Sequence, residues 1–255
     1  MYEDKRQFVR LSKECWDCLD VIKDVGYANA YTFFWSDQLK LVQQAIRKIA
    51  PDIKGDWLRF KYEGKTVTFS LSDQAIANYK PKIQEFSSFA SAVRMLGAYE
   101  DYVRKIVDLS YKIIPQRMQA FKANHKKYIT KKTNSFIKSE VGRGIDFFQE
   151  VFNYSPHPSY KPSLEFLYQL RNVTVHNSGI VDQLLYDAAN SPFINVSGTL
   201  KIGDKVYWNL SSALQLHHLL TDMLPQVDPS ICRTLKLSEI KKQAYWYLDG
   251  EDDNK

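Results

Sequence analysis

The residues best suited to chemistry lie between positions 171 and 179, where the sequence reads Arg-Asn-Val-Thr-Val-His-Asn-Ser-Gly. Arg171 carries a permanent charge whose planar donors suit phosphate, and His176 carries an imidazole that titrates near neutral pH. An arginine and a histidine acting together can cleave a phosphodiester without a metal ion. The segment therefore predicts phosphate chemistry near the end of a helix.

This run resembles the signature of the HEPN superfamily (higher eukaryotes and prokaryotes nucleotide-binding). In that signature an Arg is followed by a polar residue and, four to six residues after the Arg, by a His; Arg171, Asn172 and His176 match it. The resemblance covers roughly residues 83 to 226 as an order of helices. It implies a mainly α, HEPN-like helical bundle and a metal-independent endoribonuclease that acts as a homodimer. It further implies a role as a toxin or an antiviral defence effector.

The reaction implied by the resemblance is RNA cleavage by attack of the 2′-hydroxyl. His176 would remove the 2′-hydroxyl proton or protonate the leaving 5′-oxygen, and Arg171 would stabilise the charged phosphorane. The products would be a 2′,3′-cyclic phosphate and a 5′-hydroxyl, and Asn172 would orient the histidine or contact phosphate. No metal ion and no cofactor is expected. In the alternative interpretation, Arg171 pairs with an acid and His176 only packs at a helix end.

The spacing of the motif residues determines which of them share a face of the expected helix. Asn172 and His176 are four residues apart and so share a face, whereas Arg171 lies about 140° around a regular helix from His176. Arg171 therefore does not simply sit beside His176, and a second copy of the helix would help to assemble one site. If Gly179 ends the helix, the negative end of the helix dipole favours protonated His176.

Glu100 is the fourth candidate for the catalytic site. It lies in phase with Leu96 and Val103, on the apolar face of the longest expected helix. A carboxylate buried there without a partner costs several kcal/mol, so a cationic partner is expected. Arg171 or His176 could be that partner; alternatively, Glu100 is a partly exposed residue at the edge of the apolar stripe.

The net charge of +6 is unevenly distributed along the chain. Between residues 109 and 139 there are eight Lys and Arg residues and no Asp or Glu, so the rest of the chain is slightly acidic. Such a concentrated basic stretch suits a polyanion, and the predicted partner is RNA. The alternative is an ordinary solvated helix face. The residues predicted to bind RNA are Lys122, Lys126, Lys127, Lys131 and Lys132.

Other chemical candidates are weaker. Cys15 and Cys18 have metal-like spacing, but no second pair of ligands exists, so packing in an amphipathic helix is the preferred interpretation. Three cysteines cannot form a disulfide framework, and no apolar run approaches the roughly 20 residues that span a bilayer. These features predict a cytoplasmic protein without a membrane partner. Of His217 and His218, one is expected to face the core and the other to be exposed.

Apolar periodicity predicts the elements that must position these residues. The expected hairpins cover 57–70 and 194–209, and residues 153–158 are expected to form a loop. The expected helices cover residues 5–24, 36–49, 83–114, 144–152, 162 up to the motif, 213–224 and 237–248.

Three regions follow from this reading. Residues 1–80 form an N-terminal helical and hairpin extension, residues 81–230 the HEPN-like helical domain, and residues 231–255 a C-terminal helix with an acidic tail. Two alternatives to the nuclease remain open: a non-catalytic HEPN-like module that binds RNA, nucleotide or protein, and a helical adaptor. The sequence does not identify an inhibitory partner protein that would restrain a nuclease.

Overall fold

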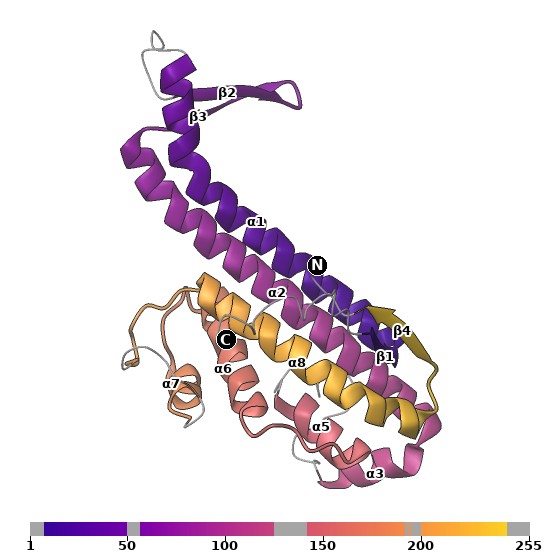
Figure 1. Ribbon diagram of the computed structural model, residues 1–255. Coiled ribbons are helices and arrows are strands. Elements are labelled where there is room, and N and C mark those ends of the chain that lie inside the picture. The colour runs from indigo at the N-terminus through magenta and orange to yellow at the C-terminus, as the bar shows by residue number, and fades with distance from the viewer. Residues whose placement is uncertain (1–7, 50–56, 125–141, 192–193, 195–199, 244–255) are drawn as a thin grey trace, which may run out of the picture.

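Three long helices running side by side dominate the computed structural model, which describes residues 8–49, 57–124, 142–191, 194 and 200–243 (Figure 1). They are α1 (Lys13–Ile49), α2 (Asp73–Ile113) and α8 (Leu210–Leu235). Four shorter helices cover one end of this layer: α3 (Pro115–Asn124), α5 (Gly142–Phe152), α6 (Tyr160–His176) and α7 (Gln183–Ala189). The predicted mainly α fold is confirmed.

A β-hairpin stands at the far end of α1 and α2 (Figure 1). It consists of β2 (Trp57–Tyr62) and β3 (Lys65–Ser70), paired antiparallel from Trp57 with Ser70 to Tyr62 with Lys65. The turn residues Glu63 and Gly64 both have positive φ, of 47° and 76°. A two-residue turn with positive φ at both positions matches the twist of antiparallel strands, so the Glu-Gly pair can close the predicted hairpin.

A second two-stranded sheet was not predicted. It pairs β1 (Phe8–Ser12) with β4 (Glu239–Gln243), and it joins the two ends of the described chain. The helix expected over 5–24 is therefore wrong over its first residues, and so is the helix expected from 237, whose residues from 244 on lie outside the described part. Lys236 ends α8 with φ of 55°, and Trp16 Nε1 donates to Ile240 O at 2.8 Å, so tertiary pairing overrides the helical pattern.

The helix α1 is longer and more continuous than predicted. It begins where the Ser12 side chain accepts a hydrogen bond from Cys15 N at 3.1 Å, and it runs unbroken to Ile49. The sequence pattern left residues 25–35 out because Gly26 and a run of aromatic residues interrupt the periodicity. Gly26 serves close packing instead, since a Cβ there would lie 2.8 Å from the His217 ring of α8.

The helix α2 begins ten residues earlier than predicted and ends as predicted. Ser72 caps it by accepting a hydrogen bond from Ala75 N at 3.2 Å, and Pro81 is accommodated inside it. Pro115 closes it and opens α3, as expected from the restriction that proline places on the preceding residue. The predicted boundary between residues 80 and 81 thus falls inside one helix.

The hydrophobic core lies where α1, α2 and α8 meet α5 and α6. Residues of the predicted N-terminal extension belong to it, including Leu11 and Trp16, which are buried together with residues of all the long helices. Phe147 and Phe148 of α5 fill its centre, and Cys15 and Cys18 are buried in it as predicted. Residues 8–22 are therefore part of the helical body rather than a separate unit.

The hairpin predicted over 194–209 is wrong in its described part. Lys205 pairs with Ile180 in an isolated antiparallel bridge, while residues 202 and 203 form a turn. Val206 N donates to Gly179 O at 2.8 Å, and Val181 N donates to Asp204 O at 2.9 Å. Residues 204–206 thus pair with the segment that follows α6 and not with a hairpin strand of their own. Residues 195–199 lie outside the described part.

Beyond the body, α1 and α2 continue as an arm, defined here as residues 27–49, residues 73–91 and the β2–β3 hairpin (Figure 1). Buried polar side chains hold its two helices together at seven-residue intervals along α1: Asn29, Ser36 and Gln43. Ser87 Oγ donates to Asn29 Oδ1 at 2.7 Å, and Gln84 Nε2 donates to Ser36 Oγ at 2.9 Å. Polar contacts thus form the inner seam of the arm.

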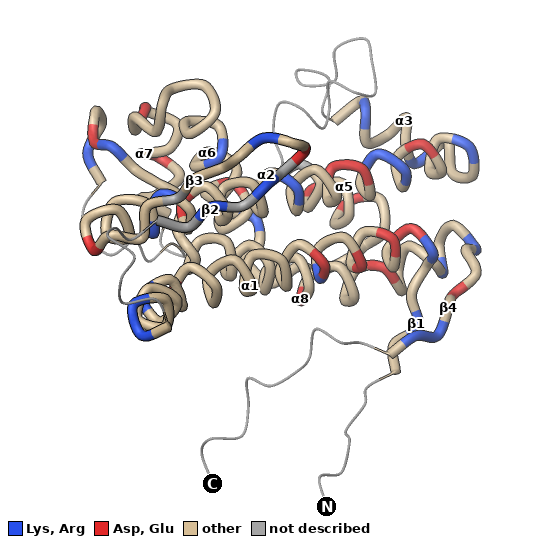
Figure 2. The backbone as a smooth tube through the Cα atoms, turned by 90° about the horizontal axis from the view of Figure 1, so that it is seen from above, with Lys and Arg blue, Asp and Glu red and all other residues tan. Residues whose placement is uncertain are grey.

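Lys and Arg residues lie on the β2–β3 hairpin and on α3, while the helices of the body carry both signs (Figure 2). Of the five lysines predicted to bind RNA, only Lys122 falls within the described residues, where it is exposed in α3. Lys126, Lys127, Lys131 and Lys132 lie outside them. None of the helices in the described part of the chain is both long and apolar enough to span a membrane.

Candidate functional site at the end of helix α6

The motif residues occupy the last turns of α6, and His176 is its final residue. Asn177 N and Gly179 N both donate to Val173 O at 2.9 Å, which closes the helix. Gly179 has φ of 80°, and a Cβ there would lie 2.5 Å from Val206 O, so the chain needs glycine at this point. The helix therefore ends close to Gly179, which leaves His176 at the negative end of the helix dipole.

Arg171 is half-buried and contacts its neighbours on α6. Its guanidinium carbon lies 5.8 Å from the centre of the Tyr168 ring, and its Nη1 donates to Asn172 Oδ1 at 3.0 Å. Burial raises the pKa of the Tyr168 hydroxyl, the Glu100 carboxylate raises it further, and Arg171 lowers it. Glu100 and Arg171 therefore both act on the Tyr168 hydroxyl, which brings the predicted carboxylate into the neighbourhood of the motif.

His176 is exposed and lies on a different side of α6 from Arg171. No hydrogen bond or ion pair joins its side chain to another residue in the described part of the chain. The half-buried guanidinium faces the Tyr168 ring, whereas the imidazole meets solvent. Within one chain the cation and the imidazole thus do not converge, as the spacing of five residues predicts.

The face of α6 that carries Asn172 and His176 borders a groove. Its earlier turns contribute Glu165 and Gln169, and Asn172 Nδ2 donates to Gln169 Oε1 at 3.4 Å. The groove has a volume of about 360 Å³ and lies between α6 and α7. It is lined by Pro162, Glu165, Tyr168, Gln169, Leu184, Asp187, Ala188 and Ser191. Because two carboxylates line it, the groove itself does not favour an anion.

Lys205 is a basic residue beside the motif that the sequence did not single out. The bridge between Ile180 and Lys205 brings it to the turn after α6, where its Cγ would lie 3.9 Å from a Cβ at Gly179. Its ammonium lies 5.2 Å from the centre of the Tyr207 ring. The Tyr207 hydroxyl raises the pKa of this lysine. Only the tertiary pairing reveals this neighbour, since 29 positions separate it from His176.

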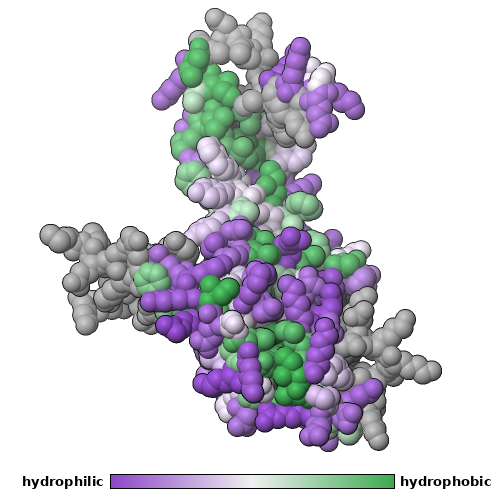
Figure 3. All heavy atoms as spheres, turned by 90° about the vertical axis from the view of Figure 1, so that its right-hand side faces the viewer, coloured by the Kyte–Doolittle hydropathy of each residue, from purple (hydrophilic) through white to green (hydrophobic). Residues whose placement is uncertain are grey.

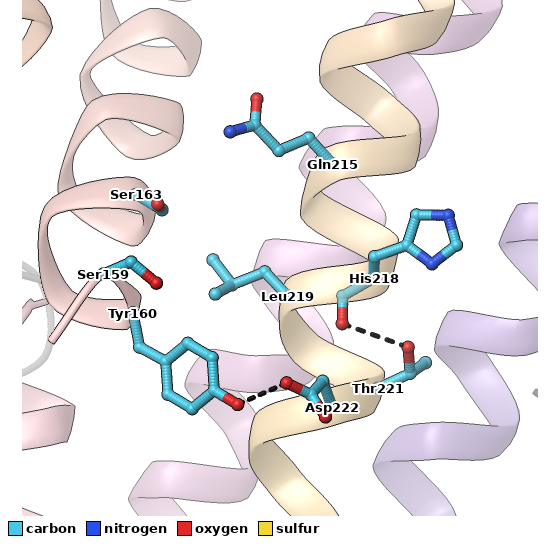
Figure 4. A pocket seen from close by; sticks show the side chains of 8 residues that line it. All are labelled: Ser159, Tyr160, Ser163, Gln215, His218, Leu219, Thr221 and Asp222. Atoms are coloured by element: carbon cyan, nitrogen blue, oxygen red, sulfur yellow. Dashed lines mark hydrogen bonds between the residues drawn. The ribbon is translucent and has the colours of Figure 1, made fainter. Parts of the chain in front are cut away.

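A second cavity, of about 560 Å³, lies between α6 and α8 (Figure 4). The Tyr160 hydroxyl donates a short hydrogen bond to Asp222, and Gln226 Nε2 donates to the oxygens of both residues at 2.9 Å. Burial, followed by Asp222, raises the pKa of Tyr160. The ring of His218 points away from Tyr160, so the imidazole does not serve this hydroxyl (Figure 4). The network joins two helices and provides no activated nucleophile.

The described residues contain no group of three or more His, Cys, Asp or Glu side chains placed to bind a metal ion. Cys15 is buried, and desolvation raises its thiol pKa well above the ordinary value. A protonated, buried thiol is a poor metal ligand. The interpretation of Cys15 and Cys18 as core residues is confirmed.

His217 faces Gly26 of α1 and is partly buried, while His218 is exposed, as predicted. Burial lowers the pKa of His217 below 6.5, and His218 lowers it further. Below pH 6.5 the unfolded chain therefore binds a proton that the folded chain does not, so stability falls as the pH falls. The melting temperature should be lower at pH 5.5 than at pH 7.5, and His217→Gln should reduce this difference. The same drop in His217→Gln as in the parent would contradict the assignment. His157→Gln is the control, because His157 is exposed and lies outside α8.

The candidate site thus consists of Arg171, Asn172 and His176 on the last turns of α6. The Tyr168 ring lies near the guanidinium, the Glu100 carboxylate acts on the Tyr168 hydroxyl, and Lys205 lies beside the helix end. Within one copy, a phosphate at this helix end would meet either the guanidinium or the imidazole. Comparisons of the chain with protein-family models, with curated proteins and with solved structures found no match.

Proposed function

We propose that the protein is a metal-independent endoribonuclease whose active site forms between two copies of the chain. The observation that carries this proposal is the placement of Arg171 and His176 on different sides of one helix end. A single copy offers a phosphate either the guanidinium or the imidazole. Two copies related by a two-fold axis present both groups, because each helix end then faces its symmetry mate.

In the proposed reaction His176 is the general base and Arg171 stabilises the transition state. His176 takes the proton of the 2′-hydroxyl, and the 2′-oxygen attacks the adjacent phosphorus. Arg171 stabilises the negative charge that develops on the phosphorane oxygens. The P–O5′ bond breaks as the 5′-oxygen accepts from the His176 imidazolium the proton that the imidazole took from the 2′-hydroxyl. Asn172 and Tyr168 hold the guanidinium in a fixed position, which reduces the reorganisation needed in the transition state.

The test is cleavage of end-labelled RNA by the purified protein in excess EDTA. The proposal predicts fragments that end in a 2′,3′-cyclic phosphate and begin with a 5′-hydroxyl. Fragments with a 3′-hydroxyl, or cleavage that requires a divalent ion, would exclude this mechanism. The RNA target and any base preference would follow from mapping the cleaved positions.

A non-catalytic module that binds RNA, nucleotide or a protein is the second candidate. One observation favours it: Asn172 and Tyr168 already engage the Arg171 guanidinium within the chain. Bound RNA that stays intact in the same EDTA reaction would support this candidate over the nuclease. A role in defence against viruses, or as a toxin, rests on the resemblance of residues 171–176 alone.

A further inference from the structure

The outward face of α1 in the arm is apolar apart from one glutamine. We call it the outer seam, and its residues follow one another at intervals of three and four: Tyr27, Tyr31, Phe34, Gln38, Leu41, Ala45 and Ile49. The five large apolar side chains of this seam keep between 47% and 84% of their surface exposed. A helix on a protein surface normally turns such a stripe toward the core.

The arm therefore departs from the usual arrangement of a helical hairpin: the most deeply buried α1 side chains in it are polar, while Phe33, Leu39 and Ile46 are half-buried. Its inner seam, against α2, contains the buried polar residues Asn29, Ser36 and Gln43, while its outer seam is aromatic and aliphatic. Hydrophobic side chains gather along this upper part of the molecule (Figure 3). Packing of α1 against α2 gives no reason for the outer seam, since these side chains point away from α2.

The size of the outer seam matches what a specific dimer needs. A fully buried aromatic side chain covers about 150 to 250 Å², so roughly half of that for each large residue leaves on the order of 600 Å² per copy. Two copies would then bury about 1,200 Å², the lower limit for stable protein interfaces. An exposed patch of this size on a monomer marks an interaction site.

The few charges of α1 in this region indicate which kind of partner fits the outer seam. From Val25 to Ile46 the helix contains one acid and one base, Asp37 and Lys40, and Asp37 already forms an ion pair with Lys80 at 2.6 Å. An RNA backbone or an anionic membrane would require an excess of cations beside the aromatic residues. The aromatic part of the seam, from Tyr27 to Phe34, has none, and Arg47 and Lys48 lie only beside its last residue, Ile49. An apolar surface of the same kind therefore fits the seam best.

We infer that the outer seam binds the outer seam of a second copy of this chain in an antiparallel, two-fold symmetric pair. The seam repeats every seven residues from Tyr27 to Leu41, as in a coiled coil, and spans about 33 Å from Tyr27 to Ile49. Its only long polar residue, Gln38, lies at its midpoint. A two-fold axis there pairs Gln38 with Gln38 of the second copy, and such a buried polar pair fixes the register.

Cysteine crosslinking tests the register directly, because the three native cysteines are buried. Gln38→Cys is expected to give a disulfide-linked dimer under mild oxidation, as is the double variant Tyr31→Cys, Ala45→Cys, whose positions are equidistant from residue 38. Gln44→Cys is the matched control, since it is exposed on the same helix but off the seam. Equal crosslinking at residues 38 and 44 would overturn the inference.

Light scattering of the full-length protein tests the pairing without any added cysteine. Tyr31→Glu and Phe34→Glu are each expected to raise the dimer dissociation constant at least about tenfold. Phe86→Glu, on the outward face of α2, should leave it unchanged; Phe86 is 72% exposed, so the substitution is comparable. Circular dichroism melts check that each variant is folded.

Two outcomes would overturn the inference. One is a parent protein that stays monomeric over the micromolar range. The other is a monomer that sediments with vesicles of phosphatidylglycerol and phosphatidylcholine and loses this binding in Tyr31→Glu. A dimer whose dissociation constant is the same in Tyr31→Glu as in Phe86→Glu would also overturn the seam pairing, and it would leave a nuclease that pairs through its α6 ends standing. A strictly monomeric parent would remove both proposals.

Discussion

Replacing His176 with alanine is expected to lower the rate of RNA cleavage by about a hundredfold to ten-thousandfold, the range for loss of a general acid or base. The side chain is exposed at the end of α6 and joins no described residue, so its removal leaves the core intact. The measurement is the initial rate of cleavage of labelled RNA in EDTA, with a melting curve recorded for each variant.

Arg171→Ala should have a comparable effect, and Arg171→Lys should recover little of it, because a lysine cannot offer two parallel donors to a phosphate. Val175→Ala is the matched control: Val175 is exposed on the same turn of α6 and takes no part in the proposed chemistry. Full activity in His176→Ala would remove the catalytic proposal. Equal losses in Val175→Ala would show that the assay reports folding instead.

Asp228→Asn is expected to lower the free energy of unfolding by about 3 kcal/mol, through the charged hydrogen bonds that it removes. The carboxylate is fully buried in α8 and accepts from Ser12 N at 2.6 Å, Ser12 Oγ at 2.7 Å and Tyr102 Oη at 2.9 Å. The substitution replaces one carboxylate oxygen by an NH2 group, which is a donor and would face the donors of Ser12 and Tyr102. Urea unfolding followed by circular dichroism measures the loss.

The melting temperature of Asp228→Asn should fall by about 6 to 12 °C, given the usual shift per kcal/mol for a chain of this size. Asp108→Asn provides the control, because Asp108 is an exposed acid of α2. A change in Asp228→Asn no larger than in Asp108→Asn would mean that the contacts joining β1, α2 and α8 contribute little to stability.

The sequence predicted those elements whose signals are local. The β2–β3 hairpin followed from alternation around a Glu-Gly turn, and α5 from a strongly amphipathic run. Pro115 marked the end of α2 because proline restricts the residue before it. Such features depend on a few neighbouring residues, so a single sequence contains them.

Elements that depend on distant partners were missed. The pairing of β1 with β4 joins residues more than 220 positions apart. The bridge between Ile180 and Lys205 pairs part of the predicted 194–209 hairpin with the segment after α6. Residues 25–35 lacked a regular apolar pattern because Asn29 is the residue buried against α2 there, while the aromatic side chains of Tyr27, Tyr31 and Phe34 are exposed. In each case tertiary contacts, absent from the local pattern, decide the structure.

The candidate site was partly foreseeable. Helical spacing placed Arg171 and His176 on different sides of one helix. Glu100 was named as a candidate from its place on the longest helix, and it raises the pKa of the Tyr168 hydroxyl, which Arg171 lowers. The groove beside α7 and the position of Lys205 arise from packing between separate segments, so spacing in the sequence could not reveal them.

Mixing two inactive variants tests the central claim most directly, namely that one copy supplies Arg171 and the other supplies His176 to the same phosphate. Arg171→Ala and His176→Ala are unfolded together in equal amounts, refolded and assayed on labelled RNA in EDTA. Half of the dimers are then mixed and contain one intact site of two, so two-fold symmetry predicts about a quarter of the parent activity. A mixture as inactive as its two components, with mixed dimers present, would contradict a site shared between copies.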